Sequence, residues 1–258
     1  MQMTIDEVKR AAKREDFRAG VQMRMLMPRL SVRVTRWVVA HTRLQPNTIT
    51  LVSLVIGLGA ALSFAAITPW VVLAGLVAYH VHTLLDYVDG EVARVRGQTS
   101  VRGAYFDLIT DRITYPLLVF CSAVGVFRET GEASALLAGF VATFGLFLDK
   151  EAVDCWYRAT FGGGDEPEDR YVAAPERRGW RLWRGRLSLL AVMARGLTAF
   201  LTYTTIAAFL DAFVPGAAAL SFRAVVLWAF AGLMPLGALA RFLLIYRRGA
   251  IPRRQQLL

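Results

Sequence analysis

Long apolar stretches separated by short polar segments dominate this sequence from residue 46 onward. A membrane-spanning helix needs about 20 predominantly apolar residues. Six segments reach or approach that length: 48–67, 70–85, 100–127, 135–148, 187–210 and 217–246. Backbone polar groups in lipid must be hydrogen-bonded within their own segment, which favours helices. The pattern therefore predicts an all-α integral membrane protein with six transmembrane helices.

The first 45 residues are polar and basic, and we expect them to form a cytoplasmic arm that ends in a juxtamembrane helix. Residues 4–28 are typical of a charged helix, which Pro28 interrupts. From residue 29 to residue 43, one face carries Arg29, Arg33 and Arg36, and another carries Leu30, Val34, Trp37 and Val38. This pattern predicts an interfacial amphipathic helix, and Trp37 favours it over a solvated basic arm.

Residues 46–258 are expected to form one membrane domain, interrupted by a cytoplasmic loop region at 150–186. Within that region, residues 157–186 contain Gly162-Gly163-Gly164, two prolines and many charges, which is typical of a loop. The two cysteines, Cys121 and Cys155, lie in different segments and are expected to be free thiols.

Charge supports a membrane location and predicts its sidedness. The chain is 55% hydrophobic and only 19% charged, less charge than a soluble domain usually carries. The amino-terminal arm, the loop after the second span, the 150–195 region and the tail hold ten, three, nine and four Lys or Arg, whereas the opposite side holds Arg128 and Arg223. The positive-inside rule then puts both termini on the cytoplasmic side of the cell membrane. The net charge of +10 indicates anionic membrane lipids, and not nucleic acid, as the partner.

Candidate chemistry is concentrated at the end of the second span and the start of the third. Asp86 and Asp89 are three residues apart, so they share one face of a helix. Asp107 and Asp111, four apart, form a second one-sided stripe. Two helices that face each other through these stripes bring four carboxylates together. A hard divalent cation with oxygen ligands, Mg²⁺ or Mn²⁺, would relieve their repulsion.

Small residues and one arginine complete this segment. Gly90, Ala93 and Gly103 leave one wall free of large side chains, so a bulky ligand can approach the backbone. Arg94 can hold the phosphate of such a ligand as a fork-shaped donor. The pattern indicates metal-assisted handling of a phosphorylated substrate at the cytoplasmic boundary. The alternative is a structural charge network of the aspartates with Arg94, Arg96 and Arg112.

The segment matches the signature D-x2-D-G-x2-A-R-x8-G-x3-D-x3-D at every fixed position. It closely resembles the CDP-alcohol phosphotransferases, also called CDP-alcohol phosphatidyltransferases. The resemblance is strong over residues 46–111 and implies transfer of a phosphoalcohol group from a CDP-alcohol to an acceptor hydroxyl, with release of CMP. It also implies a homodimer.

The resemblance assigns roles by motif position. Asp86, Asp89 and Asp107 are expected to bind the metal, and Asp111 to be both a metal-site residue and the general base. Gly90, Ala93, Arg94 and Gly103 are expected at the CDP-donor site. The segment from Pro46 to Thr50 resembles the other nucleotide-facing stretch, which adds Asn47 and Thr50. Ser100 lies where relatives contact the nucleotide through a hydroxyl.

Other residues have less specific readings. Lys150, Arg158 and Arg195 are candidates for a phosphorylated acceptor, although the positive-inside rule alone also places them at the cytoplasmic side. Glu91 points away from Asp86 and Asp89 by helical phase and is expected to be solvated. His80 and His82 are expected to pack or hydrogen-bond and not to ligate metal, and His41 to lie at the interface.

Three functions remain open at this stage. The first is phosphatidyl transfer from CDP-diacylglycerol to a polar alcohol in phospholipid synthesis. The second keeps the chemistry but uses a soluble CDP-polyol donor such as CDP-inositol. The third is a non-catalytic membrane scaffold or cation transporter. The presence of Asp111 argues against the third, because a scaffold needs no base.

Overall fold

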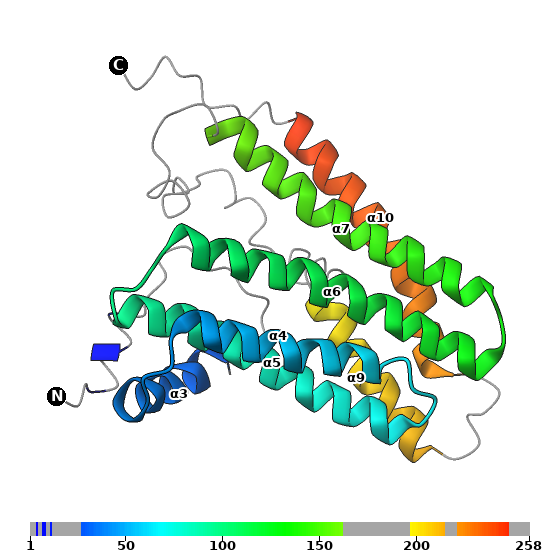
Figure 1. Cartoon of the computed structure of the whole chain (residues 1–258). Helices are drawn as coiled ribbons and strands as arrows, with labels where there is room; N and C mark the ends of the chain where they lie inside the picture. Colours follow the sequence, from blue (N-terminus) through cyan, green and yellow to red (C-terminus); the bar gives the residue numbers. More distant parts are fainter. Residues whose placement is uncertain are drawn as a thin grey trace. The chain divides into compact units, whose positions relative to one another are not determined.

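The computed structural model describes residues 27–161, 197–214 and 221–247, together with Thr4, Glu7, Val8 and Ala11. All secondary structure in these residues is helical (Figure 1). The chain divides into two compact units, Met1–Glu129 and Thr130–Leu258. The helix expected over residues 4–28 lies largely outside the described residues.

The first unit contains α3 (Met27–His41), α4 (Pro46–Ser63), α5 (Pro69–Val95) and nearly all of α6 (Val101–Thr130). Prolines start α4 and α5, at a position where the missing N–H costs no intrahelical bond. Gly97 ends α5, because it adopts the left-handed conformation (φ +64°). The N–H of Gln98 then bonds to the carbonyl of Ala93 at 2.8 Å.

Glycines allow the helices of this unit to approach closely. A Cβ on Gly57 of α4 would lie 2.9 Å from Nδ1 of His82 on α5 and 3.0 Å from a methyl of Thr114 on α6. A Cβ on Gly125 of α6 would lie 2.3 Å from the carbonyl oxygen of Phe64, just after α4. Small residues at helix contacts are typical of packing in membranes, where close backbone approach replaces the hydrophobic driving force.

Helix α3 packs against α5 and turns a polar strip toward it. Ser31 and Thr35 are fully buried, whereas Leu30 and Trp37 are 41% and 58% exposed. Helix α3 begins at Met27 and holds Pro28 in its first turn, where the missing N–H of proline has no intrahelical partner to lose. The expected interruption of a preceding helix at Pro28 concerns residues outside the described ranges and stays a prediction.

The second unit contains α7 (Ser134–Phe161), α9 (Leu197–Phe213) and α10 (Phe222–Arg247). Nε of Arg241 on α10 pairs with Oδ1 of Asp149 on α7 at 2.8 Å. Asp211 near the end of α9 accepts the backbone N–H of Phe222 at 2.9 Å and pairs with Nε of Arg223 at 3.3 Å, which ties α9 to the start of α10.

Helix α7 corrects one boundary. Residues 157–161 were expected in a loop, but α7 continues to Phe161, because the first helix-breaking residues are the glycines that start at Gly162. The remainder of the expected loop, 162–186, lies outside the described residues. The predicted division at residue 45 stays a prediction.

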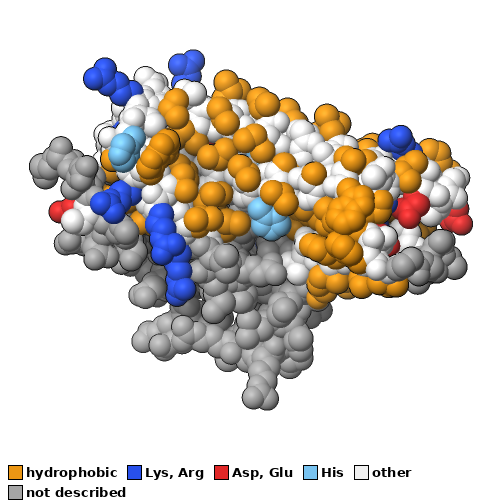
Figure 2. Space-filling view, turned by 90° about the horizontal axis from the view of Figure 1, so that it is seen from below, with side chains coloured by type: hydrophobic (Ala, Val, Ile, Leu, Met, Phe, Trp, Pro, Cys, Tyr) orange, Lys and Arg blue, Asp and Glu red, His pale blue; other side chains and the backbone are white. Residues whose placement is uncertain are grey.

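Four of the described helices are long and apolar enough to cross a membrane: α4, α5, α6 and residues 222–243 of α10. Residues 200–213 of α9 form a shorter apolar helix. Large hydrophobic side chains are exposed along these helices, among them Val55, Val77 and Leu236 at 62%, 65% and 65%. Figure 2 shows one face on which hydrophobic side chains dominate. The described residues therefore form only helical secondary structure and include apolar helices typical of a membrane protein.

Candidate functional site

The carboxyl half of α5 and the amino half of α6 bring the four motif aspartates together. Asp86 and Asp89 lie on α5 and Asp107 and Asp111 on α6. Asp86 interacts electrostatically with each of the other three. The sequence-based pairing of the two stripes is therefore present in the folded chain.

Two of these carboxylates are buried in different ways. Asp89 is 5% exposed, and its Oδ2 accepts a hydrogen bond from Oγ1 of Thr50 on α4 at 2.5 Å. Oδ1 of Asp86 is buried without a hydrogen-bond partner. A buried carboxylate oxygen without a donor is costly unless a cation or another donor satisfies it.

The oxygen-only donor set and the Asp86 oxygen fit a hard divalent cation by their chemistry. Their present arrangement does not complete a cage: across the described ranges, no three His, Cys, Asp or Glu side chains are arranged to hold an ion.

The residues expected at the donor site divide into two groups. Arg94 folds over Gly90, since a Cβ on Gly90 would lie 3.2 Å from Nη1 of Arg94. Ala93, half-buried, follows on the same helix. A Cβ on Gly103 would lie 3.2 Å from both Oδ1 of Asn47 and Oγ of Ser100. The structure thus brings Asn47 of α4 beside Ser100 and Gly103 at the start of α6.

Two hydroxyls have structural partners that the sequence interpretation omitted. Oγ of Ser100 accepts the N–H of Gly103 at 3.1 Å and so caps the start of α6. The signal was available, because a serine directly before a helix is a common N-cap. Thr50 is only 4% exposed, and its Oγ1 donates a hydrogen bond to Asp89. In this structure, Thr50 therefore orients a carboxylate.

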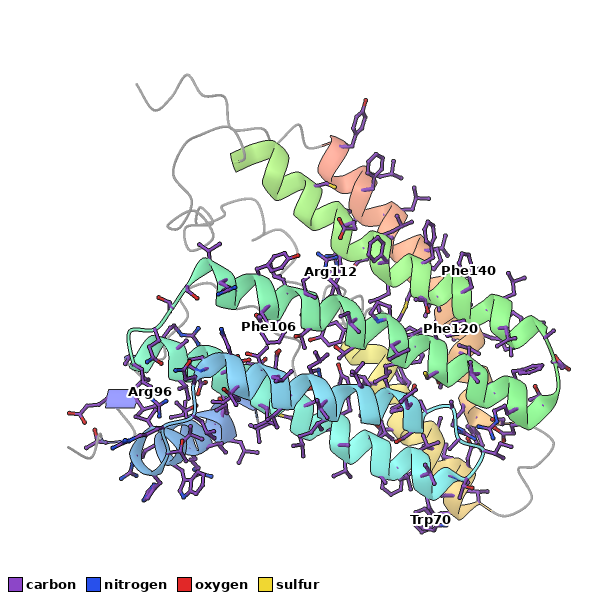
Figure 3. The ribbon with its side chains drawn as sticks, in the orientation of Figure 1. Trp70, Arg96, Phe106, Arg112, Phe120 and Phe140 are labelled. Atoms are coloured by element: carbon purple, nitrogen blue, oxygen red, sulfur yellow. The ribbon has the colours of Figure 1, made fainter. Side chains whose placement is uncertain are left out.

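A groove of about 480 Å³ lies beside Gly103, between α4 and α6. Asn47, Thr48 and Leu51 line it from α4, and Arg102, Tyr105 and Phe106 line it from α6. Figure 3 labels Phe106 on the side of α6 that faces α4. Sequence reasoning identified Asn47 but not Arg102 or Tyr105, which lie between fixed motif positions.

Glu91 is not solvated, contrary to expectation. It is 6% exposed and accepts hydrogen bonds from Oγ of Ser31 and Oγ1 of Thr35, both at 2.7 Å. Helical phase correctly separates Glu91 from Asp86 and Asp89, but α3 covers the side of α5 on which it lies. The hydroxyls at i and i+4 of α3 were the only sequence signal.

The hydrogen bonds expected of His80 and His82 and the free state expected of both cysteines are present. His82 is fully buried and its Nδ1 lies 2.8 Å from Oγ of Ser53. Nδ1 of His80 lies 2.7 Å from the carbonyl oxygen of Leu76. Cys121 and Cys155 are free thiols. His41 is exposed at the end of α3.

The candidate acceptor residues belong to the second unit or lie outside the described residues. Lys150 is half-buried on α7. Arg158 is in α7, with its side chain outside the description, and Arg195 is outside it altogether. Their role stays a prediction.

The segment that carries this site is similar to known proteins. Residues 43–153 match the family model described as CDP-alcohol phosphatidyltransferase. The chain is similar to proteins named bifunctional IPC transferase and DIPP synthase. The one from Thermococcus kodakarensis is 38% identical over 93 residues, covering 36% of this chain and 20% of the relative. The one from Archaeoglobus fulgidus is 29% identical over 143 residues, covering 55% and 26%.

The chain thus spans about a fifth to a quarter of the length of these curated relatives. Among solved structures, it is similar to Mycobacterium tuberculosis phosphatidylinositol phosphate synthase with CDP-DAG bound. That match has a TM-score of 0.59 and 20% sequence identity, and it covers 87% of this chain and 98% of the other. At this identity, the likeness concerns the fold.

Proposed function

We propose that this protein transfers a phosphoalcohol group from a CDP-alcohol to an acceptor hydroxyl and releases CMP, because residues 43–153 match the CDP-alcohol phosphatidyltransferase family model. The observation that carries the proposal is the meeting of Asp86, Asp89, Asp107 and Asp111 at one end of α5 and α6. The favoured donor is CDP-diacylglycerol and the favoured acceptor a polar alcohol, in phospholipid synthesis.

In this proposal, Asp86, Asp89, Asp107 and Asp111 hold Mg²⁺ or Mn²⁺. When bound, the ion neutralises the donor diphosphate and the charge that develops on departing CMP. Asp111 accepts the proton of the attacking hydroxyl, so that the oxygen can bond to phosphorus as the bond to CMP breaks. Thr50 keeps Asp89 oriented through its 2.5 Å hydrogen bond.

The donor is proposed to lie along Gly90, Ala93, Arg94 and Gly103, with its nucleotide end near Asn47, Thr50 and Ser100. Arg94, folded over Gly90, can turn its guanidinium to a phosphate without crossing a large side chain. The groove between α4 and α6, beside Gly103, can receive part of this ligand. Lys150, Arg158 and Arg195 are proposed to bind the acceptor.

A soluble CDP-polyol donor, such as CDP-inositol, is the second candidate. We keep this second donor because the curated relatives are named IPC transferase and DIPP synthase, whereas the structural relative is named phosphatidylinositol phosphate synthase and has CDP-DAG bound. Purified protein, metal and labelled CDP-diacylglycerol or CDP-inositol would be mixed with a panel of alcohols and sugar phosphates. CMP release with a labelled lipid product identifies the first donor. Cytidine nucleotide and metal binding without CMP release from any pair would favour the scaffold.

Activity is expected to require Mg²⁺ or Mn²⁺, because the motif supplies only oxygen ligands, and Zn²⁺ is not expected to be a native activator. Treatment with excess EDTA should abolish CMP release, and added Mg²⁺ or Mn²⁺ should restore it. An EDTA sample saturated with Mg²⁺ beforehand is the control for the chelator itself. Undiminished turnover after thorough chelation would remove the metal from the mechanism.

Six spans, with the site and both termini on the cytoplasmic side, are proposed from the charge distribution. Single cysteines at Glu129 and Glu176, placed in a chain without Cys121 and Cys155, should react with an impermeant maleimide from opposite sides of the membrane. Detergent-permeabilised vesicles, in which both positions should react, are the control. Labelling of both from one side would disprove this topology. A homodimer is proposed on the family resemblance alone.

A further inference from the structure

Glu91 is a buried acidic residue that the proposed chemistry does not use. It lies on α5 two residues after Asp89, and its carboxylate receives two hydrogen bonds of 2.7 Å from fully buried hydroxyls of α3. A carboxylate with 6% exposure requires such donors, since burial without them is strongly unfavourable. The contact is therefore a specific tether between α3 and the helix that carries the motif.

The tether and the site lie on opposite sides of the same helical turn. Residues two apart in an α-helix point about 200° apart, at 3.6 residues per turn. Asp89 is bonded to Thr50 of α4, whereas Glu91 is bonded to Ser31 and Thr35 of α3. Hydrogen bonds on both sides thus oppose rotation of α5 about its axis at the position where it carries the metal-site candidates.

Further contacts at the same end of α5 reinforce the tether. The guanidinium of Arg96 donates to the carbonyl oxygens of Leu44, Thr42 (2.8 Å) and Val38 (3.4 Å), at the end of α3 and just after it. Figure 3 labels Arg96 at this end of α5, beside α3. Val38 and Ile49 also form a buried apolar cluster with Val88 and Val92, one residue before Asp89 and one after Glu91.

We propose that Glu91, held by Ser31 and Thr35, is a positioning residue that sets the orientation of Asp89 and the following Gly90–Arg94 segment for metal and donor binding. Glu91 touches neither, and acts through α5. The proposal rests on the proposed function for its meaning, since it concerns that same site. Misplacement of a reacting group by about 1 Å can cost about 10²-fold in rate, so control of helix rotation matters here.

The test measures Mn²⁺ binding to the full chain in lipid nanodiscs by electron paramagnetic resonance, together with the Mn²⁺ concentration that gives half-maximal CMP release. Glu91→Ala removes both tether bonds and should weaken Mn²⁺ binding about 10-fold, the lower range for loss of a group that orients a metal ligand. Glu91→Gln should retain most of the parent Mn²⁺ affinity. Its amide oxygen can accept a hydrogen bond from one hydroxyl, and its NH₂ group can donate one to the other.

A second variant keeps the proposal testable if Glu91→Ala does not fold. Ser31→Ala with Thr35→Val removes the donors and keeps Glu91, and should weaken Mn²⁺ binding by a similar factor. Arg128→Met is the matched control: it removes the 2.9 Å bond from Arg128 to the carbonyl oxygen of Ala65, at the far end of α6. It should lower thermal stability at most, with Mn²⁺ affinity unchanged.

Parent-like Mn²⁺ affinity in both Glu91→Ala and the Ser31/Thr35 variant would overturn the proposal. An equal loss of affinity in Arg128→Met would also overturn it, since the effect would then be general destabilisation. These outcomes are separate from failure of the proposed function, which would appear as a parent protein that binds Mn²⁺ but releases no CMP.

Discussion

Replacement of Asp111 by asparagine is expected to lower CMP release by about 10²- to 10⁴-fold, the usual contribution of a general base. This corresponds to about 3 to 5 kcal/mol of transition-state stabilisation. Asparagine keeps the size of the side chain and one coordinating oxygen, but it cannot accept the proton of the attacking hydroxyl. The loss should therefore appear in kcat, with most of the donor affinity retained.

The measurements are single-turnover CMP release and binding of a CDP-alcohol to the same purified variant. Glu132→Gln is the control for removal of one carboxylate, since Glu132 is exposed between α6 and α7, outside the motif. Near-parent turnover of Asp111→Asn would show that another group accepts the proton. A loss of donor binding as large as the loss of turnover would assign Asp111 to metal binding alone.

Asp86→Asn is expected to act through the metal. Its buried Oδ1 has no hydrogen-bond partner, so an ion is the natural group to satisfy it. The asparagine amide is a weaker metal ligand than a carboxylate and carries no negative charge. Loss of a residue that only orients a ligand typically lowers metal affinity by roughly 10- to 100-fold, so the loss of a ligand itself should cost at least as much. Donor affinity should fall with it, because in the proposed mechanism a bound ion would hold the diphosphate.

The distinguishing measurement is donor affinity at several Mg²⁺ concentrations. For Asp86→Asn, higher Mg²⁺ should recover part of the donor binding. Arg94→Ala is the comparison. Its donor KM should rise at every Mg²⁺ concentration, because the variant would lose the proposed phosphate contact, which we expect in ground and transition states alike. Donor binding by Asp86→Asn that equals the parent at low Mg²⁺ would exclude Asp86 as a ligand.

Much of this architecture follows from local pattern. Apolar run length predicted the starts of α4, α5, α6 and α7 to within two residues, because lipid imposes both a length and a helical backbone. Helices α5 and α7 continue ten and thirteen residues beyond the apolar runs that end at residues 85 and 148. Pro46 and Pro69 lie at helix starts, where the backbone N–H that proline lacks would have no intrahelical hydrogen-bond partner. The motif spacing placed Asp86 and Asp89 on one face and Asp107 and Asp111 on another, and the structure brings these faces together.

Tertiary structure alone decided which neighbour covers each remaining face. Helical phase shows that Glu91 points away from Asp89, but it does not show whether that side of α5 meets solvent or another helix. Glu91 is buried because α3 packs on that side of α5. Thr50 is equally ambiguous until α4 lies against α5 and directs its hydroxyl to Asp89. Sequence periodicity reports directions around one axis, whereas burial and hydrogen-bond partners depend on contacts between residues distant in the chain.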